Sequence, residues 1–194
     1  IRQMTHELNV DGFRVIALGY RKMSASHKVY SVADETELVL VGIMAFLDPP
    51  KESVPAAIRS LSEHGIEVKI LTGDNEIITQ RICREVGIRI QNVLLGDVID
   101  KMSDEELEKH VNQTNIFAKL APLQKSRIIR TLQKLGHTVG FLGDGINDAA
   151  ALRDSDVGIS VDTATDIAQE SADIILLEKN LMVLSHGVLK GREV

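Results

Sequence analysis

The sequence predicts an α/β fold, in which a mostly parallel β-sheet carries helices on both faces. Three features of residues 51–194 lead to this prediction: short apolar segments alternate with segments of helical length, glycines stop several of the helices, and polar turns follow the apolar segments. Repeated strand–helix units of this length are typical of parallel strands joined by crossover helices. Residues 1–47 have a different, β-rich pattern.

The β-rich part is predicted to contain a helix, two strands and a loop. Loosely alternating apolar residues over 13–23 and the apolar run over 38–47 indicate the strands. The polar stretch 24–37 indicates a loop between them, and a short helix is predicted over 2–8. We expect Met44, within the apolar run, to lie in the core.

The apolar run ends at the segment Asp48-Pro49-Pro50. Two consecutive prolines have fixed φ angles and no amide donors, so they stiffen the chain as it leaves a sheet. We therefore predict a hinge at 48–50, between a first part (1–47) and a second part (51–194).

The second part is predicted to contain alternating helices and strands. A glycine follows three of the helices, Ser103 and Glu106 form a capping box, and Pro122 lies in the first turn of its helix. The predicted helices cover residues 51–64, 75–86, 103–111, 122–135, 146–152, 163–171 and 180–192. The predicted strands cover residues 66–71, 93–98, 116–118, 138–142, 157–161 and 174–177.

Composition excludes several classes of function. With 22 basic and 28 acidic residues the net charge is −6, so nucleic acid is not an expected partner. Cys83 is the only cysteine, which rules out an internal disulfide; we expect it in the core and the chain in a reducing, cytosolic setting. The run 38–47 is about half of the ~20 residues that a membrane-spanning helix needs. Because the sequence starts at Ile1 and lacks an initiator methionine, we expect a piece of a longer protein.

A polar turn with three chemically useful side chains follows the predicted strand 138–142. It contains Asp144, Asn147 and Asp148 within a glycine-relaxed segment. Oxygen ligands of this kind suit Mg²⁺, which usually keeps waters and also touches a phosphate. The alternative is a polar turn that only caps a helix. The residues favour a metal site with Asp144 as the main ligand.

A second turn, at Thr72, Gly73 and Asp74, also lies between a strand and a helix. A hydroxyl and exposed amides at a helix N-terminus can hold phosphate oxygens, although the same tripeptide could be a simple turn with an aspartate cap. Lys125, near the start of the helix 122–135, could neutralise a phosphoryl group or could be a surface lysine. Ligands of doubly wound sheets bind beyond the carboxyl ends of the strands, so both turns can face one site.

Taken together, these motifs resemble the phosphorylation domain of P-type cation-transporting ATPases, members of the haloacid dehalogenase-like superfamily with a Rossmann-like fold. The resemblance covers roughly residues 38–194, and its four motifs occur in the family's order: 48–51, 71–75, 117–119 with 122–125, and 143–149 with 151–152. Residues 157–162 and 172–179 look most like the magnesium-transporting branch of bacteria. One departure is Ala150, where the family usually has proline; this loosens the turn but removes no ligand.

The resemblance implies a cycle in which ATP phosphorylates an aspartate, the aspartyl phosphate is hydrolysed, and both steps drive cation movement across a membrane. It implies that Lys125 neutralises the phosphoryl group and that Mg²⁺ binds Asp144 and Asp148. The phosphate-binding turn would be Thr72, Gly73 and Asp74, with Asn147 completing the pocket and Asp48, Pro49 and Pro50 forming the hinge.

The resemblance also implies the setting of the chain. Residues 1–47 would be the end of a nucleotide-binding domain and residues 51–194 most of a phosphorylation domain. Its partners would be ATP, the transported cation and the nucleotide, actuator and membrane domains of the same polypeptide. The chain would then be a cytoplasmic domain of an integral plasma-membrane protein.

The family's nucleophile is missing from this sequence. It is the aspartate of an Asp-Lys-Thr-Gly-Thr turn, and neither that string nor the ATP-binding Lys-Gly-Ala motif occurs here. We therefore expect neither autophosphorylation nor transport from this chain alone. The nucleophile's strand would lie between the strands that end at Leu71 and Leu142, so we expect a swapped strand there or a sheet that closes up.

Three other interpretations stay open from the sequence. A soluble haloacid dehalogenase-like phosphatase would use the same phosphate-binding residues, but it too needs the missing aspartate. A calcium- or proton-pumping P-type ATPase shares most of the motifs. A binding or regulatory module with a dead site is the third alternative, and the intact Lys125 and Asp144 argue against it.

Overall fold

The computed structural model describes residues 1–24, 29–47, 49–178 and 180–193, which fall into two compact units, Ile1–Pro49 and Pro50–Val194. Pro49 ends the first unit and Pro50 begins the second, whereas Asp48 of the predicted hinge lies outside the described residues. So do Lys179 and residues 25–28 of the predicted loop. The assignment of the units to named domains stays a prediction.

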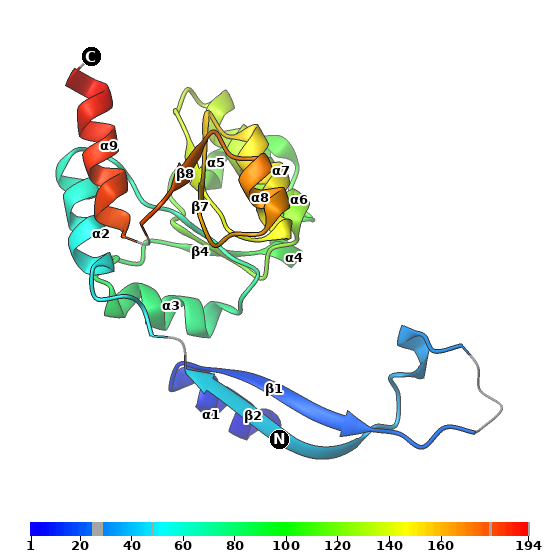
Figure 1. The fold of residues 1–194 in the computed structure, drawn as a ribbon. Helices are drawn as coiled ribbons and strands as arrows, with labels where there is room; N and C mark the ends of the chain where they lie inside the picture. The colour runs from blue at the N-terminus through cyan, green and yellow to red at the C-terminus, as the bar shows by residue number, and fades with distance from the viewer. Residues whose placement is uncertain (25–28, 48, 179, 194) are drawn as a thin grey trace. The chain divides into compact units, whose positions relative to one another are not determined.

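The first unit is an antiparallel hairpin with one helix. Helix α1 (Arg2–Val10) precedes strand β1 (Phe13–Tyr20), and a 3-10 turn η1 (Val32–Asp34) precedes strand β2 (Val39–Leu47) (Figure 1). The strands pair from Phe13 opposite Leu47 to Tyr20 opposite Val39, and α1 packs on β1. These elements agree with the predicted helix, strands and loop.

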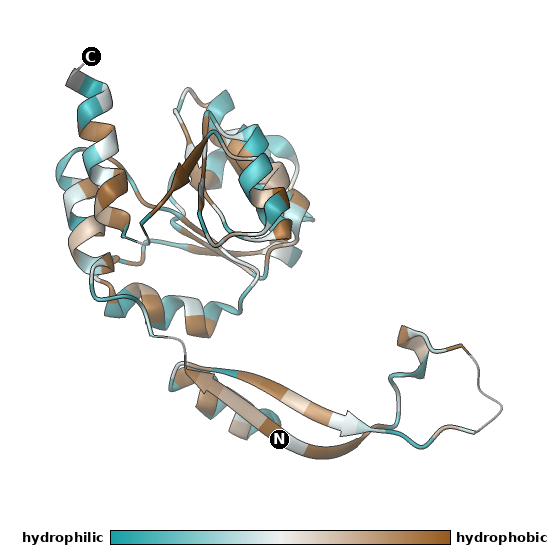
Figure 2. Cartoon of the chain, viewed as in Figure 1, coloured by the Kyte–Doolittle hydropathy of each residue, from teal (hydrophilic) through white to brown (hydrophobic). Residues whose placement is uncertain are grey.

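The first unit leaves many apolar side chains uncovered. Met44 is 46% exposed, so the prediction that it lies in the core is wrong for this chain. The reason is that two strands and one short helix provide no second layer, and a lone two-stranded hairpin is marginally stable. Figure 2 shows the apolar residues along both strands; the exposed ones include Ile16, Leu18, Val41 and Phe46.

The second unit confirms the predicted α/β fold. All of its strand pairs are parallel, in the orders β3-β5-β4 and β6-β7-β8, so the strands form two three-stranded sheets rather than one continuous sheet. The strands are β3 (Ile70–Leu71), β4 (Val93–Leu95), β5 (Ile116–Ala118), β6 (Gly140–Leu142), β7 (Val157–Val161) and β8 (Ile174–Leu176). The helices are α2 (Val54–Glu63), α3 (Glu76–Glu85), α4 (Gly96–Ile99), α5 (Asp104–Val111), α6 (Pro122–Lys134), the 3-10 turn η2 (Ile146–Asp148), α7 (Ala149–Asp154), α8 (Asp166–Glu170) and α9 (Leu181–Glu193) (Figure 1).

Several predicted strands are shorter in the structure, and two of them, 66–71 and 93–98, keep half of their predicted length or less. The segment 66–71 is a strand only at its end, because the Ile66 N–H donates to the Leu61 carbonyl and closes the C-terminus of α2. The segment 93–98 turns into α4 at Gly96, whose backbone lies so close to the Lys119 carbonyl that a Cβ there would be 2.3 Å from its oxygen. The predicted capping box of α5 is confirmed by hydrogen bonds in both directions between Ser103 and Glu106.

Alternate residues of the sheet β3-β5-β4 enter two different core clusters, as the period of a β-strand requires. One cluster joins the strands to α2 and α3 through Ile70, Val93, Ile116, Ile58 and Cys83. The other joins them to α5 and α6 through Leu71, Leu94, Phe117, Leu107 and Ile128. Cys83 is only 2% exposed, as predicted, and burial raises its thiol pKa to about 11. Helices therefore cover both faces of this sheet.

Helix α6 links the two sheets. Its Ile128 belongs to the cluster around Phe117, and the next residue, Ile129, belongs to the cluster around Phe141. The partly buried Leu71 also contacts both clusters. Both sheets are thus fixed to one helix, and the loops that follow their strands have a common support.

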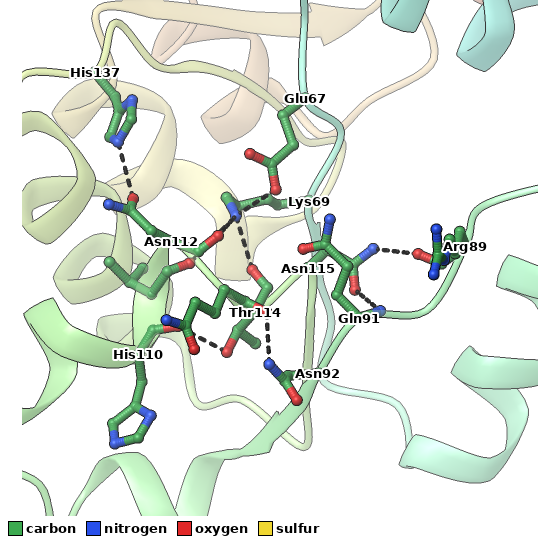
Figure 3. Close-up of polar contacts among 12 residues, drawn as sticks. Glu67, Lys69, Arg89, Gln91, Asn92, His110, Asn112, Thr114, Asn115 and His137 are labelled. Carbon is green, nitrogen blue, oxygen red and sulfur yellow. Dashed lines mark hydrogen bonds and ion pairs between the residues drawn. The ribbon is translucent and has the colours of Figure 1, made fainter.

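A polar network ties together the segments that lead into the strands β3, β4 and β5 (Figure 3). The Lys69 ammonium donates to the carboxylate of Glu67 and the carbonyl of Thr114, both at 2.8 Å, and to two further carbonyls at the C-terminus of α5. Asn115 accepts from the Gln91 N–H and donates to the Arg89 carbonyl. A cation at a helix C-terminus is favoured by the helix dipole. The network fixes the amino ends of the strands and therefore the positions of their carboxyl ends.

Helix α9 lies beside α2 (Figure 1). The hydroxyls of Ser60 and Ser185 are 2.7 Å apart, and the Arg192 guanidinium donates to the His64 carbonyl at 2.7 Å. Within the described ranges, no helix combines the length and the apolar character needed to cross a membrane.

Candidate functional site

Backbone hydrogen bonds connect the turn 72–74 to the end of β5 and the segment that follows it. The Thr72 N–H donates to the Phe117 carbonyl at 2.9 Å, and the Leu120 N–H donates to the Thr72 carbonyl at 3.0 Å. The Lys119 N–H donates to the Asp74 carbonyl at 2.8 Å. These three bonds hold the predicted phosphate-binding turn at the carboxyl end of the sheet, where ligands of such folds bind.

Asn75, rather than Asp74, caps the helix that follows this turn. Its side-chain oxygen accepts from the N–H groups of Ile77 and Ile78, both at 3.0 Å. The Thr72 hydroxyl oxygen accepts from the Asp74 N–H at 3.0 Å, which leaves the hydroxyl hydrogen able to donate to another group. The alternative prediction that Asp74 caps the helix is therefore wrong, because Asn75 is the cap. The roles of Thr72, Gly73 and Asp74 in phosphate binding stay a prediction.

Two hydrogen bonds with strand β7 hold the glycine turn that follows β6. The Gly143 N–H donates to the Ile159 carbonyl at 3.1 Å, and the Gly143 carbonyl accepts from the hydroxyl of Ser160 at 2.8 Å. Ser160 is fully buried and was not predicted as a site residue; a lone serine in the apolar strand 157–161 was the available signal. A buried hydroxyl needs a hydrogen-bond partner, so this bond fixes the position of the turn relative to β7.

Lys125 and Asp148, predicted separately, lie in direct contact. The Lys125 ammonium is 2.7 Å from Asp148 Oδ1, and the exposed fractions of the two side chains are 11% and 12%. The other carboxylate oxygen of Asp148 accepts from the Gly145 N–H at 3.1 Å. Both oxygens are therefore engaged within the chain, which makes Asp148 the group that holds Lys125 in this structure. Its predicted role as a metal ligand remains untested.

Asp144 and Asn147 are exposed on the same turn. The Asp144 carbonyl accepts from the Thr165 N–H at 3.1 Å, which fixes the backbone. From the part of the chain that the structure describes, we find no hydrogen bond to the side chain of either residue. The Asp144 carboxylate is thus available to a ligand.

The residues present fit a Mg²⁺ ion that takes only part of its ligands from this chain. The described residues contain no group of three or more His, Cys, Asp or Glu side chains that could hold a metal by themselves. Mg²⁺ is commonly bound through one or two carboxylates together with waters and substrate phosphates, and the available Asp144 meets that need. When bound, the ion neutralises charge on phosphoryl oxygens.

Strands β3 and β6 are edge strands of the two sheets, and in the part of the chain that the structure describes each lacks a partner on one side. Among the described residues, strand β3 pairs only with β5 and strand β6 only with β7, and no strand pairs with both β3 and β6. The sheet has therefore not closed up, and no strand from the described ranges fills the predicted position. The two turns predicted to form the phosphate site, 72–74 and 143–148, follow these two edge strands directly.

Comparison with known proteins assigns the family. Residues 7–156, more than half of the chain, match the haloacid dehalogenase-like hydrolase family. The chain belongs to this family. The resemblance to that superfamily, inferred from the motifs, is therefore confirmed.

This haloacid dehalogenase-like chain is also similar to curated transport proteins. It is 59% identical over 191 residues, 97% of the chain, to "Magnesium-transporting ATPase, P-type 1" of Salmonella typhimurium, and 51% identical over 192 residues, 99% of the chain, to the protein of the same name from Escherichia coli. It is 35% identical over 196 residues, the whole chain, to a calcium-transporting ATPase of Listeria monocytogenes. The chain spans only about a fifth of the length of these relatives, 21% for the first two and 22% for the third.

Replacing Gly143 by alanine is expected to lower the free energy of unfolding by about 1–3 kcal/mol, the usual cost of overpacking. The added Cβ would lie 2.6 Å from the Cβ of Asp148 and would push that side chain from its partners. Urea unfolding of the purified chain measures the change. Gly145→Ala is the control, because a Cβ there would meet nothing closer than 3.4 Å; equal losses in both variants would contradict the close packing at Gly143.

Restoring the family's proline with Ala150→Pro is expected to raise the free energy of unfolding by at most about 1 kcal/mol. Residue 150 is the second residue of α7, where an amide has no partner four residues back within the helix, so proline is tolerated. The gain is limited because Ala149 has helical angles, which are unfavourable before proline. A loss above about 1 kcal/mol in urea unfolding would contradict this placement in the first turn.

Proposed function

We propose that the chain carries most of the phosphorylation domain, and the end of the nucleotide-binding domain, of a P-type ATPase that couples ATP hydrolysis through an aspartyl phosphate to cation transport. The observation that carries this proposal is the 59% identity, over 97% of the chain, to a magnesium-transporting P-type ATPase. The buried Lys125–Asp148 pair supports it, because phosphoryl transfer relies mainly on positioning and charge stabilisation.

The proposed transported ion is Mg²⁺. Identities of 59% and 51% to two magnesium transporters, against 35% to a calcium transporter, favour magnesium over calcium. The transported Mg²⁺ is cargo and is distinct from the Mg²⁺ that would assist phosphoryl transfer at Asp144.

In the proposed site, each residue has a separate role. Lys125, held by Asp148, neutralises the phosphoryl oxygens, while Asp144 provides the carboxylate for the catalytic Mg²⁺. The Thr72 hydroxyl and the Gly73 N–H donate to phosphoryl oxygens at the N-terminal side of α3. Asp74 stays a candidate in that turn, and Asn147 a candidate for orienting the metal's waters or the phosphate.

The unpaired edges of β3 and β6 favour completion of the site by another segment of the same polypeptide. The proposed segment is the strand that carries the nucleophilic aspartate of the Asp-Lys-Thr-Gly-Thr turn, which would emerge between the two phosphate-site turns. The uncovered apolar residues of the first unit favour, in the same way, further strands of a nucleotide-binding domain. Asp48, Pro49 and Pro50 are the proposed hinge between these domains.

The proposed setting follows from the same relatives. The chain would be a cytoplasmic portion of an integral plasma-membrane protein, with ATP as its substrate and the nucleotide, actuator and membrane domains of its own polypeptide as partners. Neither autophosphorylation nor transport is expected of the chain alone.

A soluble phosphatase is the second candidate, because the chain belongs to a hydrolase family. The purified chain with Mg²⁺ and p-nitrophenyl phosphate separates the two. We expect no turnover above buffer from the chain and ATP hydrolysis from the full-length parent. Turnover by the chain that disappears in Asp144→Asn would favour the phosphatase and contradict the proposal.

A further inference from the structure

Lys119 adopts an unusual backbone conformation at the edge of the candidate site. Its φ is 53°, in the left-handed region, which is unfavourable for a lysine because its Cβ crowds the carbonyl oxygen. Among the described residues, Glu37 in the first unit is the only other non-glycine residue with a positive φ. Such a conformation persists only where the surrounding structure demands it.

Contacts on two sides of Lys119 hold it in this backbone conformation. Its N–H donates to the Asp74 carbonyl at 2.8 Å, and the next N–H, of Leu120, donates to the Thr72 carbonyl at 3.0 Å. Its own carbonyl oxygen lies against Gly96, where a Cβ would come within 2.3 Å. The left-handed turn therefore directs two successive N–H groups at the turn 72–74 while its carbonyl stays packed on the start of α4.

The Lys119 side chain reaches the helix that follows the same turn. Its ammonium is 2.8 Å from Glu76 Oε2, with exposed side-chain fractions of 50% and 28%. Glu76 is the first residue of α3. The adjacent Lys119 ammonium is the main cause that lowers the pKa of Glu76 below its ordinary value, so the carboxylate stays ionised beside the turn.

An ionised glutamate at this position competes with a bound anion. A carboxylate in the first turn of a helix interacts favourably with the helix dipole, but it also repels a phosphate held at the same N-terminus. The ammonium of Lys119 cancels this charge. It does so without contacting Asp148, the partner of Lys125.

We infer that Lys119 is a positioning residue for the turn 72–74: its backbone holds the turn in place, and its ammonium neutralises Glu76 so that the turn can receive a phosphate. This inference rests on the proposed function, since it takes Thr72 and Gly73 as phosphate ligands. A lysine in the left-handed region has no sequence signal.

The backbone part is tested without ligand, on the ¹⁵N-labelled 194-residue chain. Lys119→Val places a β-branched residue where the left-handed region is least tolerated, whereas asparagine tolerates it. Hydrogen exchange at the Leu120 amide is expected to accelerate at least about tenfold in Lys119→Val and to stay within about twofold of the unaltered chain in Lys119→Asn. Equal exchange in the two variants would overturn the backbone part.

The charge part is tested on the same chain by NMR. Lys119→Asn is expected to raise the Glu76 pKa toward 4.5, and Lys119→Arg to keep it low. Inorganic phosphate, added at constant ionic strength, is followed through the Thr72 and Gly73 amides. The affinity for phosphate is expected to fall about two- to fivefold in Lys119→Asn, the range for a partly exposed ion pair. In Lys119→Arg it is expected to stay unchanged.

Glu76→Gln gives the decisive comparison. Charge neutralisation predicts unchanged or tighter phosphate binding in Glu76→Gln, and recovery to within about twofold of the unaltered chain when it is combined with Lys119→Asn. Weakening by Glu76→Gln equal to that by Lys119→Asn would overturn the charge role. If phosphate moves no amide of the unaltered chain while the Glu76 pKa still depends on Lys119, the role of Lys119 in phosphate binding is wrong. The proposed function, which rests on the identity to P-type ATPases, is not affected by that result.

Discussion

Replacing Lys125 by methionine is expected to lower the free energy of unfolding of the chain by about 3 kcal/mol, as is usual when one partner of a buried ion pair is removed. The ammonium of Lys125 and the carboxylate of Asp148 are 2.7 Å apart, and both side chains are nearly buried, at 11% and 12% exposed. Methionine keeps the volume of the lysine stem but leaves Asp148 charged and without its cation. Urea unfolding of the purified chain measures the loss.

The double variant Lys125→Met with Asp148→Asn is the control for this prediction. An asparagine carries no charge, and its side-chain oxygen can still accept from the Gly145 N–H. We expect the double variant to recover to within about 1 kcal/mol of the unaltered chain. A loss below about 1 kcal/mol in Lys125→Met, or no recovery in the double variant, would contradict a buried, mutually dependent pair.

Asp144→Asn in the full-length parent is expected to reduce phosphoenzyme formation from ATP by at least about 100-fold, the scale for losing one electrostatic group of a phosphoryl site. Because Asp144 is exposed and its carboxylate makes no hydrogen bond within the described residues, the fold should not suffer. Rapid-quench measurement of phosphoenzyme over a range of Mg²⁺ concentrations gives the result, with partial recovery expected at high Mg²⁺.

Asp162→Asn provides the matched control for Asp144. Asp162 is also exposed, and its replacement by asparagine removes the same charge as Asp144→Asn. It lies in the turn after β7 and has no assigned role in the site. We expect phosphoenzyme formation within about twofold of the unaltered parent. Equal losses in both variants would indicate a general electrostatic effect and contradict the assignment of the metal to Asp144.

Much of the fold of the second unit could be predicted because its signals are local. Helix stops by glycine, the Ser103–Glu106 capping box and the apolar strand 116–118 depend on neighbouring residues, and the structure agrees with them. The error at Gly96 has a different origin. The chain leaves the strand at Gly96, where the Lys119 carbonyl packs closely against the backbone, and such a contact between distant segments has no signal in the local pattern.

The candidate site was predictable as a set of residues but not as an arrangement. The motifs pointed to Lys125 and Asp148 separately, whereas their direct contact depends on how α6 packs against η2. The left-handed conformation of Lys119 depends on the turn 72–74 and could not be predicted from a lysine. The exposure of Met44 depends on layers that the described chain does not supply.

The most direct test of the central claim is phosphorylation of the full-length parent by ATP labelled at the γ-phosphate, in the presence of several cations including Mg²⁺. The account predicts an acid-stable phosphoenzyme that hydroxylamine removes, as expected for an aspartyl phosphate. It also predicts loss of that phosphoenzyme in Asp144→Asn and its retention in Asp162→Asn. Absence of any hydroxylamine-sensitive phosphoenzyme with every cation would contradict the account.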